Sequence, residues 1–380
     1  MIDHIELRQG EEPGFHEAGD ERHDWLTPFQ SARWVQSWQD RVGSMTRFKP
    51  VTAICHGAGQ PVLKLPLAVV RRFGANILTW SAYPQSDYTA PIVSRAHMAN
   101  LQRLDGARIM REIAARIGGI DLIYMPKQPG LIGTVPNPFV LPGAVPYHVG
   151  AHAINFRPGE SWEESLKRRR SGKTLKRLRE KRAALEKLGP VRFRIAATEA
   201  EARRMIDSCL TAKTDQLQKL GHWDPFSPPG VRDFLVSFFS SNIGHSTWAI
   251  SLEVDGKPAA TAFGFRDHEQ WLLYQMSMPS GPEARQSPGT HMLMDLMRHC
   301  IAQGVQRLDL ALGDESYKAE WCDEHISLNI STLAFTARGH VLDKLVRMRT
   351  SLRSRMASDA KLYERAKWVK GLARKLHLPV

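Results

Sequence analysis

Residues 287–301, with the sequence SPGTHMLMDLMRHCI, indicate the fold of this protein more clearly than any other segment. The apolar residues recur at helical spacing from Met292 onward, so a helix begins directly after the Pro-Gly turn. Residues 270–277 before the turn predict a strand, and residues 306–312 after the helix alternate in hydrophobicity as another strand. A strand, a tight turn, a helix and a second strand make one α/β unit.

The turn Ser287-Pro288-Gly289-Thr290 has a chemical meaning of its own. A helix that starts without a capping side chain presents free backbone N–H groups and the positive end of its dipole. Such an end binds phosphate without needing a basic side chain. An ordinary helix start after a Pro-Gly turn is an equally good interpretation of this fragment alone, because short Gly-containing loops often match by chance.

The same order of elements occurs twice along the chain. Each half predicts a hairpin, a third strand, a helix and a last strand, which is an α/β sheet unit. The expected elements are strands 51–56, 61–70 and 76–81, helix 107–117 and strand 121–125, and then strands 247–254, 258–265 and 270–277, helix 290–303 and strand 306–312. A ligand in such a unit lies at the helix N-terminus.

The positive charge is concentrated in two segments. The formal net charge is +13. Residues 160–188 hold eleven Lys and Arg against five Asp and Glu, and residues 341–380 hold eleven against three. We expect one long basic helix over 160–188 and a helical tail from about Val341. The rest of the chain is close to neutral, so any anionic surface or nucleic acid would meet these two segments.

Composition excludes several classes of protein. A hydrophobic content of 42% with ten Trp and fourteen Phe is that of a globular protein with a core. No apolar run reaches the length of a membrane span, and the N-terminus lacks the features of a signal peptide. The four cysteines are scattered, which predicts neither disulfides nor a zinc site and favours the cytoplasm. His148 and His152 lie in a non-helical segment without a suitably spaced carboxylate, so we expect no metal.

Several short motifs in a fixed order resemble a known family. They include Phe29-Gln30-Ser31 before Trp34 and Trp38, the Ser86-Asp87-Tyr88 stretch, Arg168-Arg169-Arg170, Ser287-Pro288-Gly289, and Gly313-Asp314 before Tyr317-Lys318 and Trp321. The chain is similar to CelD/BcsL-type acetyltransferases, which are bacterial GNAT proteins associated with cellulose and exopolysaccharide biosynthesis and related to FemAB aminoacyltransferases. The similarity runs from about residue 25 to 335.

The resemblance implies a tandem GNAT fold of the α/β class. Its parts are an N-terminal unit at 1–150, a basic helical linker at 151–190, a C-terminal unit at 191–340 and a basic tail at 341–380. It implies acetyl-CoA, or another acyl-CoA, as the donor. The donor pyrophosphate is expected on a loop with fewer glycines than most GNAT proteins have, which consists of Gln286, Ser287, Pro288, Gly289 and Thr290.

The resemblance also implies the reacting residues. Lys318 and Tyr317 match an aromatic–Lys pair of FemAB-like proteins, and Asp87 matches a proposed proton acceptor. Asp314 is a candidate loop cap or base. Tyr88, Lys213 and Trp321 complete the expected substrate-binding set. From the residues alone, Lys318 as a solvated loop lysine, Asp87 as the cap of a turn and Lys213 as a solvent-facing helix lysine remain alternatives.

Three functions follow as hypotheses. The first is acyl transfer to an amine or hydroxyl of a sugar nucleotide, a lipid-linked sugar or a polysaccharide precursor. The second is FemAB-like transfer from aminoacyl-tRNA, with the basic segment 160–188 lying along RNA phosphates. The third is a non-catalytic scaffold in exopolysaccharide biosynthesis. The Leu/Met stripe between arginines in the tail is compatible with an anionic membrane surface, which would place the cytoplasmic protein peripherally at the inner membrane.

Overall fold

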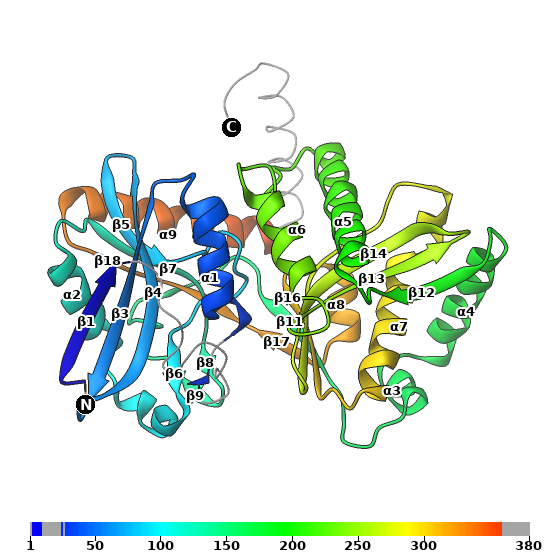
Figure 1. Cartoon of the computed structure of the whole chain (residues 1–380), viewed down its shortest axis with the longest axis horizontal. Coiled ribbons are helices and arrows are strands. Elements are labelled where there is room, and N and C mark those ends of the chain that lie inside the picture. The colour runs from blue at the N-terminus through cyan, green and yellow to red at the C-terminus, as the bar shows by residue number, and fades with distance from the viewer. Residues whose placement is uncertain (1, 10–23, 26, 359–380) are drawn as a thin grey trace, which may run out of the picture.

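The computed structural model describes residues 2–9, 24–25 and 27–358 (Figure 1). Two α/β units lie side by side, and each is built on one mixed sheet. Strand β1 (His4–Gln9) lies at the outer edge of the first unit, and α9 (Ala337–Ser358) lies behind the sheet of that unit. The expected α/β class with two related units is confirmed.

The first sheet contains the strands of the N-terminal half and one strand from near the C-terminus. Its order is β1 (His4–Gln9), β3 (Phe48–Gly57), β4 (Gln60–Arg72), β5 (Ala75–Trp80), β7 (Leu122–Pro129), β18 (Leu328–Ala334) and β10 (Val145–Pro146). Two short strands, β2 (Asp24–Trp25) and β6 (Ile92–Ser94), pair with each other, and β6 also pairs with β4. A separate small hairpin joins β8 (Leu131–Ile132) to β9 (Val135–Pro136).

The second sheet has the corresponding arrangement. Its order is β12 (Val191–Ile195), β13 (Thr247–Val254), β14 (Lys257–Arg266), β15 (Gln270–Ser277), β16 (Arg307–Leu312), β11 (Ala151–Asn155) and β17 (Glu324–Ile326). In both sheets the third strand of the repeat runs parallel to the strand that follows the helix, as β5 does to β7 and β15 to β16. The predicted repeat is therefore present in three dimensions.

The two units are interleaved at the sheet position next to the last repeat strand. Strand β18, which follows the whole second repeat, pairs antiparallel with β7 of the first sheet. Strand β11, which precedes the second repeat, pairs antiparallel with β16 of the second sheet. The chain therefore crosses between the units at both junctions, and these crossings bring the ends of β7 and β16 toward one another.

The helices cover the sheets and connect the units. They are α1 (Ala32–Trp38), α2 (Gly106–Ile117), α3 (Trp162–Arg169), α4 (Gly172–Glu186), α5 (Glu199–Leu220), α6 (Val231–Ser241), α7 (Pro288–Ala302), α8 (Ser316–Trp321) and α9 (Ala337–Ser358). Short 3-10 and π turns are η2 (Pro28–Gln30), η3 (Gln39–Gly43), η4 (Arg95–Arg103) and η5 (Pro282–Gln286).

The expected single basic helix over 160–188 is wrong. The segment forms two helices, because Arg170 adopts an extended conformation and Ser171 caps a new helix by accepting from the N–H of Thr174. A serine in this position ends one helix and starts the next, since its side chain satisfies an N–H that has no helical partner. The basic residues are consequently divided between two helix directions.

One aromatic core spans both units. Trp34 and Trp38 on α1 of the first unit are fully buried. The Trp34 ring lies 4.7 Å from Phe234 and 5.0 Å from Phe238, both on α6 of the second unit. Edge-to-face contacts of this kind add stability beyond the burial of area. The helix α1 therefore fixes the first unit against the second.

The tail is partly integrated into the first unit. In α9, Arg347 donates to the carbonyl of Gly143 and forms an ion pair with Asp343. Another face of α9 is open, with Val341, Leu345, Met348 and Leu352 between 48% and 64% exposed. The tail prediction for 359–380 lies outside the described residues.

Candidate functional site

The loop 81–90, between β5 and β6, is held firmly at the junction of the units. From α1, the indole of Trp34 donates to the Ser86 hydroxyl at 3.2 Å, and the indole of Trp38 donates to the Gln85 side chain at 2.6 Å. From the second unit, the Tyr274 hydroxyl donates to the carbonyl of Gln85 at 2.9 Å. Buried hydrogen bonds from two directions leave the loop little conformational freedom.

Tyr88, expected to bind substrate, instead ties this loop to the second unit. Its hydroxyl donates to the carboxylate of Asp309 on β16, at 2.9 Å from each oxygen. Tyr88 is 5% exposed, and its side chain links the two units. Burial and the adjacent Asp309 carboxylate raise the pKa of Tyr88, which keeps the hydroxyl protonated as a donor.

Asp87 occupies the position in this loop that faces the end of β16. The backbone N–H of Leu312, at the end of β16, favours the ionised carboxylate of Asp87 and so lowers its pKa. Removal from water raises the pKa of Asp87 from 3.8 to about 6, and the ammonium groups of Lys127 and Lys318 oppose part of that rise. Such a carboxylate is ionised at neutral pH and still basic enough to accept a proton.

Lys127 on β7 is a buried charge that sequence reasoning missed. Its ammonium group donates to the carbonyl oxygens of Tyr83, Pro84 and Ser86, at 2.7 to 3.5 Å. Its backbone has a φ of 60°, a left-handed conformation that non-glycine residues seldom adopt. Burial lowers the pKa of Lys127, and the Asp87 carboxylate raises it. Lys127 therefore anchors the loop that carries Asp87.

Lys318 on α8 is buried as well, with 3% exposure. Its ammonium group donates to the carbonyl oxygens of Leu312 at 2.9 Å and Ala311 at 3.3 Å, and lies 3.1 Å from the Glu315 carboxylate. An ammonium group has three donors, and these three partners occupy them all. Lys318 therefore fixes the end of β16 and contributes positive charge near Asp87, and the alternative of a solvated loop lysine is wrong.

The end of β16 is strained where these residues meet. Ala311 has a φ of 53°, and its N–H donates to the Asp309 carboxylate at 2.7 Å. Strained backbone of this kind costs on the order of 1–3 kcal/mol and is retained where surrounding contacts impose it. The Asp309 carboxylate accepts from the N–H of Ala311, and the Lys318 ammonium group donates to the carbonyl oxygen of Ala311.

The remaining residues of the predicted Lys318 motif support it structurally. Tyr317 is half-buried and packs against the core of the second unit, which raises its pKa. Trp321, expected to contact substrate, is 1% exposed and packs in the core of the second unit. The Arg170 guanidinium lies 4.1 Å from the Trp321 ring centre, which shows that Trp321 supports the start of the basic segment.

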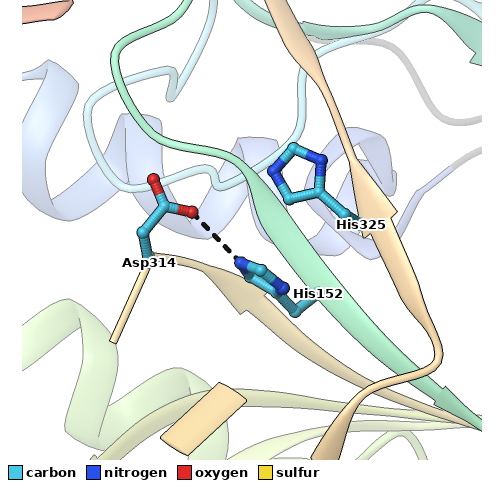
Figure 2. Close-up of side chains that lie close together, drawn as sticks. All are labelled: His152, Asp314 and His325. Atoms are coloured by element: carbon cyan, nitrogen blue, oxygen red, sulfur yellow. Dashed lines mark hydrogen bonds and ion pairs between the residues drawn. The ribbon is translucent and has the colours of Figure 1, made fainter. Parts of the chain in front are cut away.

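Asp314 belongs to a cluster with two histidines, drawn in Figure 2. The Asp314 carboxylate lies 3.1 Å from Nε2 of His152 and accepts from the N–H of Gly150 at 3.2 Å. The His152 and His325 rings are 5.0 Å apart. The ligand atoms of the three side chains lie within 4.8 Å of one another, close enough to hold a metal ion. Sequence reasoning considered His148 with His152 and missed His325.

Strands β15 and β16 diverge beside this cluster. Within the described residues, the two strands are paired at three positions, where Gln270–Leu272 of β15 lies beside Arg307–Asp309 of β16. Tyr274 is an extra residue in the pairing of β15 with β14, and a β-bulge of this kind bends its strand. The bend separates the later residues of β15 from β16 and opens the sheet toward the N-terminus of α7.

The predicted donor loop lies at that opening but is less open than expected. Ser287 has a φ of 56° and gives α7 no side-chain cap. Pro288 has no N–H, and the N–H of Thr290 donates to the carbonyl of Ser287. The N–H of Gly289 meets the sulfur of Met278 at 3.1 Å, a weak acceptor that an anionic oxygen can replace. Gln286 ends the 3-10 turn before the helix.

A basic side chain reaches the loop from the preceding linker. Lys181 on α4 donates to the Ser287 hydroxyl at 2.7 Å. Next to it, a cavity of about 340 Å³ lies between α3, α4 and α7, and its lining consists of apolar side chains, His291, three arginines and two carboxylates (Arg179, Arg182, Arg298, Glu163 and Asp295). Nε2 of His291 is buried without a partner among the described residues. The arginines outnumber the carboxylates even though Asp295 pairs with Arg182, and only the fold brings this basic lining beside the loop.

Lys213 lies at the other side of the opening. It is half-buried on α5, one turn after Cys209, whose thiol contacts the backbone of β15. Ser277, at the end of β15, donates to the carbonyl of Cys209. Lys213 is therefore close to the divergent end of β15 and separate from the Asp87 loop.

Among the helices of residues 2–9, 24–25 and 27–358, none has the length and apolarity of a membrane span.

Comparisons with known proteins agree with this architecture. Residues 172–319 match the model of a family described as Acetyltransferase (GNAT) domain. No curated protein matches the sequence significantly. The crystal structure of FemX is similar with a TM-score of 0.55 and 8% identity, over 84% of this chain and 94% of that chain.

Two further solved structures show weaker similarity. The structure of L-PGS from Bacillus licheniformis gives a TM-score of 0.47 at 8% identity, over 84% of this chain and 96% of that chain. The tandem GNAT protein from the clavulanic acid biosynthesis pathway gives 0.42 at 11% identity, over 88% and 100%. Residues 172–319 thus match a GNAT acetyltransferase domain, the chain contains two related mixed-sheet units, and it is accordingly assigned as an acyltransferase.

Proposed function

We propose that the protein transfers an acetyl or longer acyl group from acyl-CoA to an amine or hydroxyl group. The observation that carries this proposal is the divergence of β15 and β16 opposite an uncapped α7, with Asp87 held beside the end of β16. A thioester donor needs an extended slot with an anion-binding end. The acceptor needs a base at the place where the slot reaches the junction.

The second unit is the better donor site of the two. Helix α2 of the first unit corresponds to α7, but the Asp105 carboxylate caps it by accepting from the N–H of Arg108. A Cβ at Gly106 would collide with the carbonyl of Pro138, so backbone packs directly against this helix start. A negative capping group and a closed surface both disfavour an anion. By contrast, α7 has no side-chain cap, its Gly289 N–H meets only the weak sulfur acceptor of Met278, and Lys181 lies beside it.

The reacting groups follow from the contacts at the junction. Asp87 accepts a proton from the attacking amine or hydroxyl, because its carboxylate is ionised at neutral pH. Lys127 and Lys318 fix the two backbone segments that flank it. With its three donors occupied by the protein, Lys318 acts through its charge and through the position of β16. Both lysines are thus positioning residues in this proposal.

The acceptor class comes from the CelD/BcsL resemblance. That resemblance favours a sugar nucleotide, a lipid-linked sugar or a polysaccharide precursor of cellulose or exopolysaccharide. An exposed apolar face on α9, flanked by Lys344 and Arg349, supports a peripheral position on an anionic membrane where such lipid-linked acceptors reside. Sedimentation with anionic vesicles tests this, and Leu345→Glu should abolish it while Leu220→Glu, on an exposed leucine of α5, should not.

The alternative donor is aminoacyl-tRNA, as in FemAB proteins. The Arg168-Arg169-Arg170 stretch is a weak candidate for RNA, because its guanidinium groups pair with Glu160, Asp323 and Glu320. Lys176 and Arg177 on α4 are exposed and remain available. Salt-sensitive tRNA binding that Lys176→Gln with Arg177→Gln abolishes would favour this donor.

The decisive experiment measures thermal stability against acetyl-CoA. A ligand that binds only the folded state raises the midpoint, by an amount equivalent to about 2.7 kcal/mol at one hundred times its Kd. Ser287→Glu adds a negative charge where the pyrophosphate should bind, and Ser287→Gln is its neutral control of similar size. We expect a shift for the wild type and the Gln variant, and none for the Glu variant. No shift for the wild type contradicts an acyl-CoA donor.

A further inference from the structure

We propose that His152, Asp314 and His325 bind one divalent transition-metal ion of the Zn²⁺ class. The proposal does not depend on the identity of the donor or the acceptor. Two imidazole nitrogens and one carboxylate oxygen are a ligand set that zinc accepts. The three ligand atoms already lie within 4.8 Å of one another.

The sheet order brings these side chains together. His152 on β11 is the direct partner of His325 on the antiparallel strand β17. Directly opposed residues have Cβ atoms about 4.5–5.5 Å apart, and their side chains are on the same face. On its other side β11 pairs with β16, and Asp314 follows the end of that strand. Three adjacent strand positions therefore supply the three ligands, as Figure 2 shows.

Gly150 gives independent support for a constructed site. A Cβ at this position would collide with the imidazole of His325, so only glycine lets that ring come close to the other two ligands. The N–H of Gly150 also donates to both oxygens of Asp314, at 3.2 and 3.3 Å. A hydrogen bond to a ligating carboxylate orients it, and such supporting contacts raise metal affinity.

The distances suit a zinc ion after a small movement. Bonds of about 2.0–2.2 Å in a tetrahedral site separate ligand atoms by roughly 3.3 Å. His152 and Asp314 are 3.1 Å apart. His325 is exposed, and a side-chain movement of roughly 1.5 Å brings its nitrogen to the same spacing. Three protein ligands leave the fourth position to water, and Asp314, whose side chain is 48% exposed, gives solvent access to the site.

Metal binding would replace the hydrogen bond between His152 and Asp314. A ligating histidine must be neutral with its Nε2 lone pair free, so binding releases any proton held between these groups. The competing explanation is a hydrogen-bonded His–Asp pair that stabilises the junction without an ion. If the three side chains bind a metal ion, replacing His325 lowers the affinity for that ion. If His152 and Asp314 only stabilise the junction, replacing His325 has no such effect.

The test uses the full chain after removal of metals with a chelator. Co²⁺ is titrated while visible absorbance is recorded, and Zn²⁺ is then added as a competitor. We expect one Co²⁺ per chain, with the strong absorbance bands of a four-coordinate site, and loss of these bands when Zn²⁺ displaces it. His325→Ala and Asp314→Asn should each weaken Co²⁺ binding by at least about 100-fold, because each removes a ligand.

Two further variants separate ligation from general damage. Gly150→Ala keeps all three ligands but displaces His325, so it should also weaken binding, by about 10-fold or more. His268→Ala removes a histidine whose side chain is 87% exposed outside the cluster and should change nothing. Urea unfolding without metal checks that each variant is folded. Absence of Co²⁺ binding by the wild type, or equal binding by His325→Ala and Asp314→Asn, overturns the proposal.

Discussion

Replacing Asp87 with asparagine should make the protein progressively more stable than the wild type as pH rises. In the folded protein the pKa of Asp87 is about 6, and its ordinary value is 3.8. The unfolded chain therefore loses this proton at lower pH than the folded chain does. Rising pH favours the unfolded state through this group, because the folded pKa is the higher one.

The magnitude follows from the two pKa values. The stabilisation from the bound proton is present below about pH 3.8 and is lost as pH rises through 6. The full effect is about 3 kcal/mol, of which about 1.4 kcal/mol falls between pH 5 and pH 8. Relative to the wild type, Asp87→Asn should gain about 1.4 kcal/mol in unfolding free energy across that interval, because asparagine does not titrate.

The assay is urea unfolding of both proteins at several pH values between 5 and 8. Asp121→Asn provides a control of opposite sign, because Thr336 and the N–H of Asn76 lower the pKa of Asp121. This control is measured below about pH 5, where Asp121 titrates: the variant should lose stability relative to the wild type as pH rises toward the ordinary value of 3.8, and the difference should stay constant above it. A difference between wild type and Asp87→Asn that stays constant with pH would refute the reasoning. The same pKa predicts that kcat/KM of the wild type rises through about pH 6.

Three further substitutions test separate contacts. Tyr88→Phe removes the donor to the buried Asp309 carboxylate and should cost about 1.5–3 kcal/mol in urea unfolding; a cost near zero contradicts the link between the units. Lys181→Met leaves the Ser287 hydroxyl without its ammonium donor and should weaken acetyl-CoA binding about tenfold by calorimetry, whereas unchanged affinity excludes α4 from the donor site. Gly264→Ala puts a methyl group against the carbonyl of Leu272 and should lower stability by about 1–3 kcal/mol in thermal unfolding; an unchanged midpoint contradicts that close packing.

Local pattern was sufficient for most of the secondary structure. Strands β13 and β15 have the predicted ends, and the repeat of hairpin, strand, helix and strand is present in both units. These segments have strong hydrophobic periods, and Gly or Pro marks many of their ends. The basic segment 160–188 was harder, because Ser171 both follows one helix and caps the next.

The candidate site was only partly predictable. Asp87, Asp314, Lys318 and the loop 286–290 stand out because each follows a strand or precedes a helix. Their surroundings depend on residues without a local signal, such as Lys127 inside β7 and Asp309 inside β16. A polar residue in a strand has no pattern that distinguishes a buried anchor from an exposed side chain.

By itself, the sequence determined the two α/β repeats, the uncapped start of α7 and the residue types available for chemistry. Periodicity and turn residues act over a few positions, so they suffice for such features. The tertiary structure alone decided that β11 and β18 cross between the sheets, that Asp87 lies half-buried near Leu312, and that His152 meets His325. These pairings join residues that are distant along the chain, and they depend on the order of strands in the sheets and on the packing of one unit against the other.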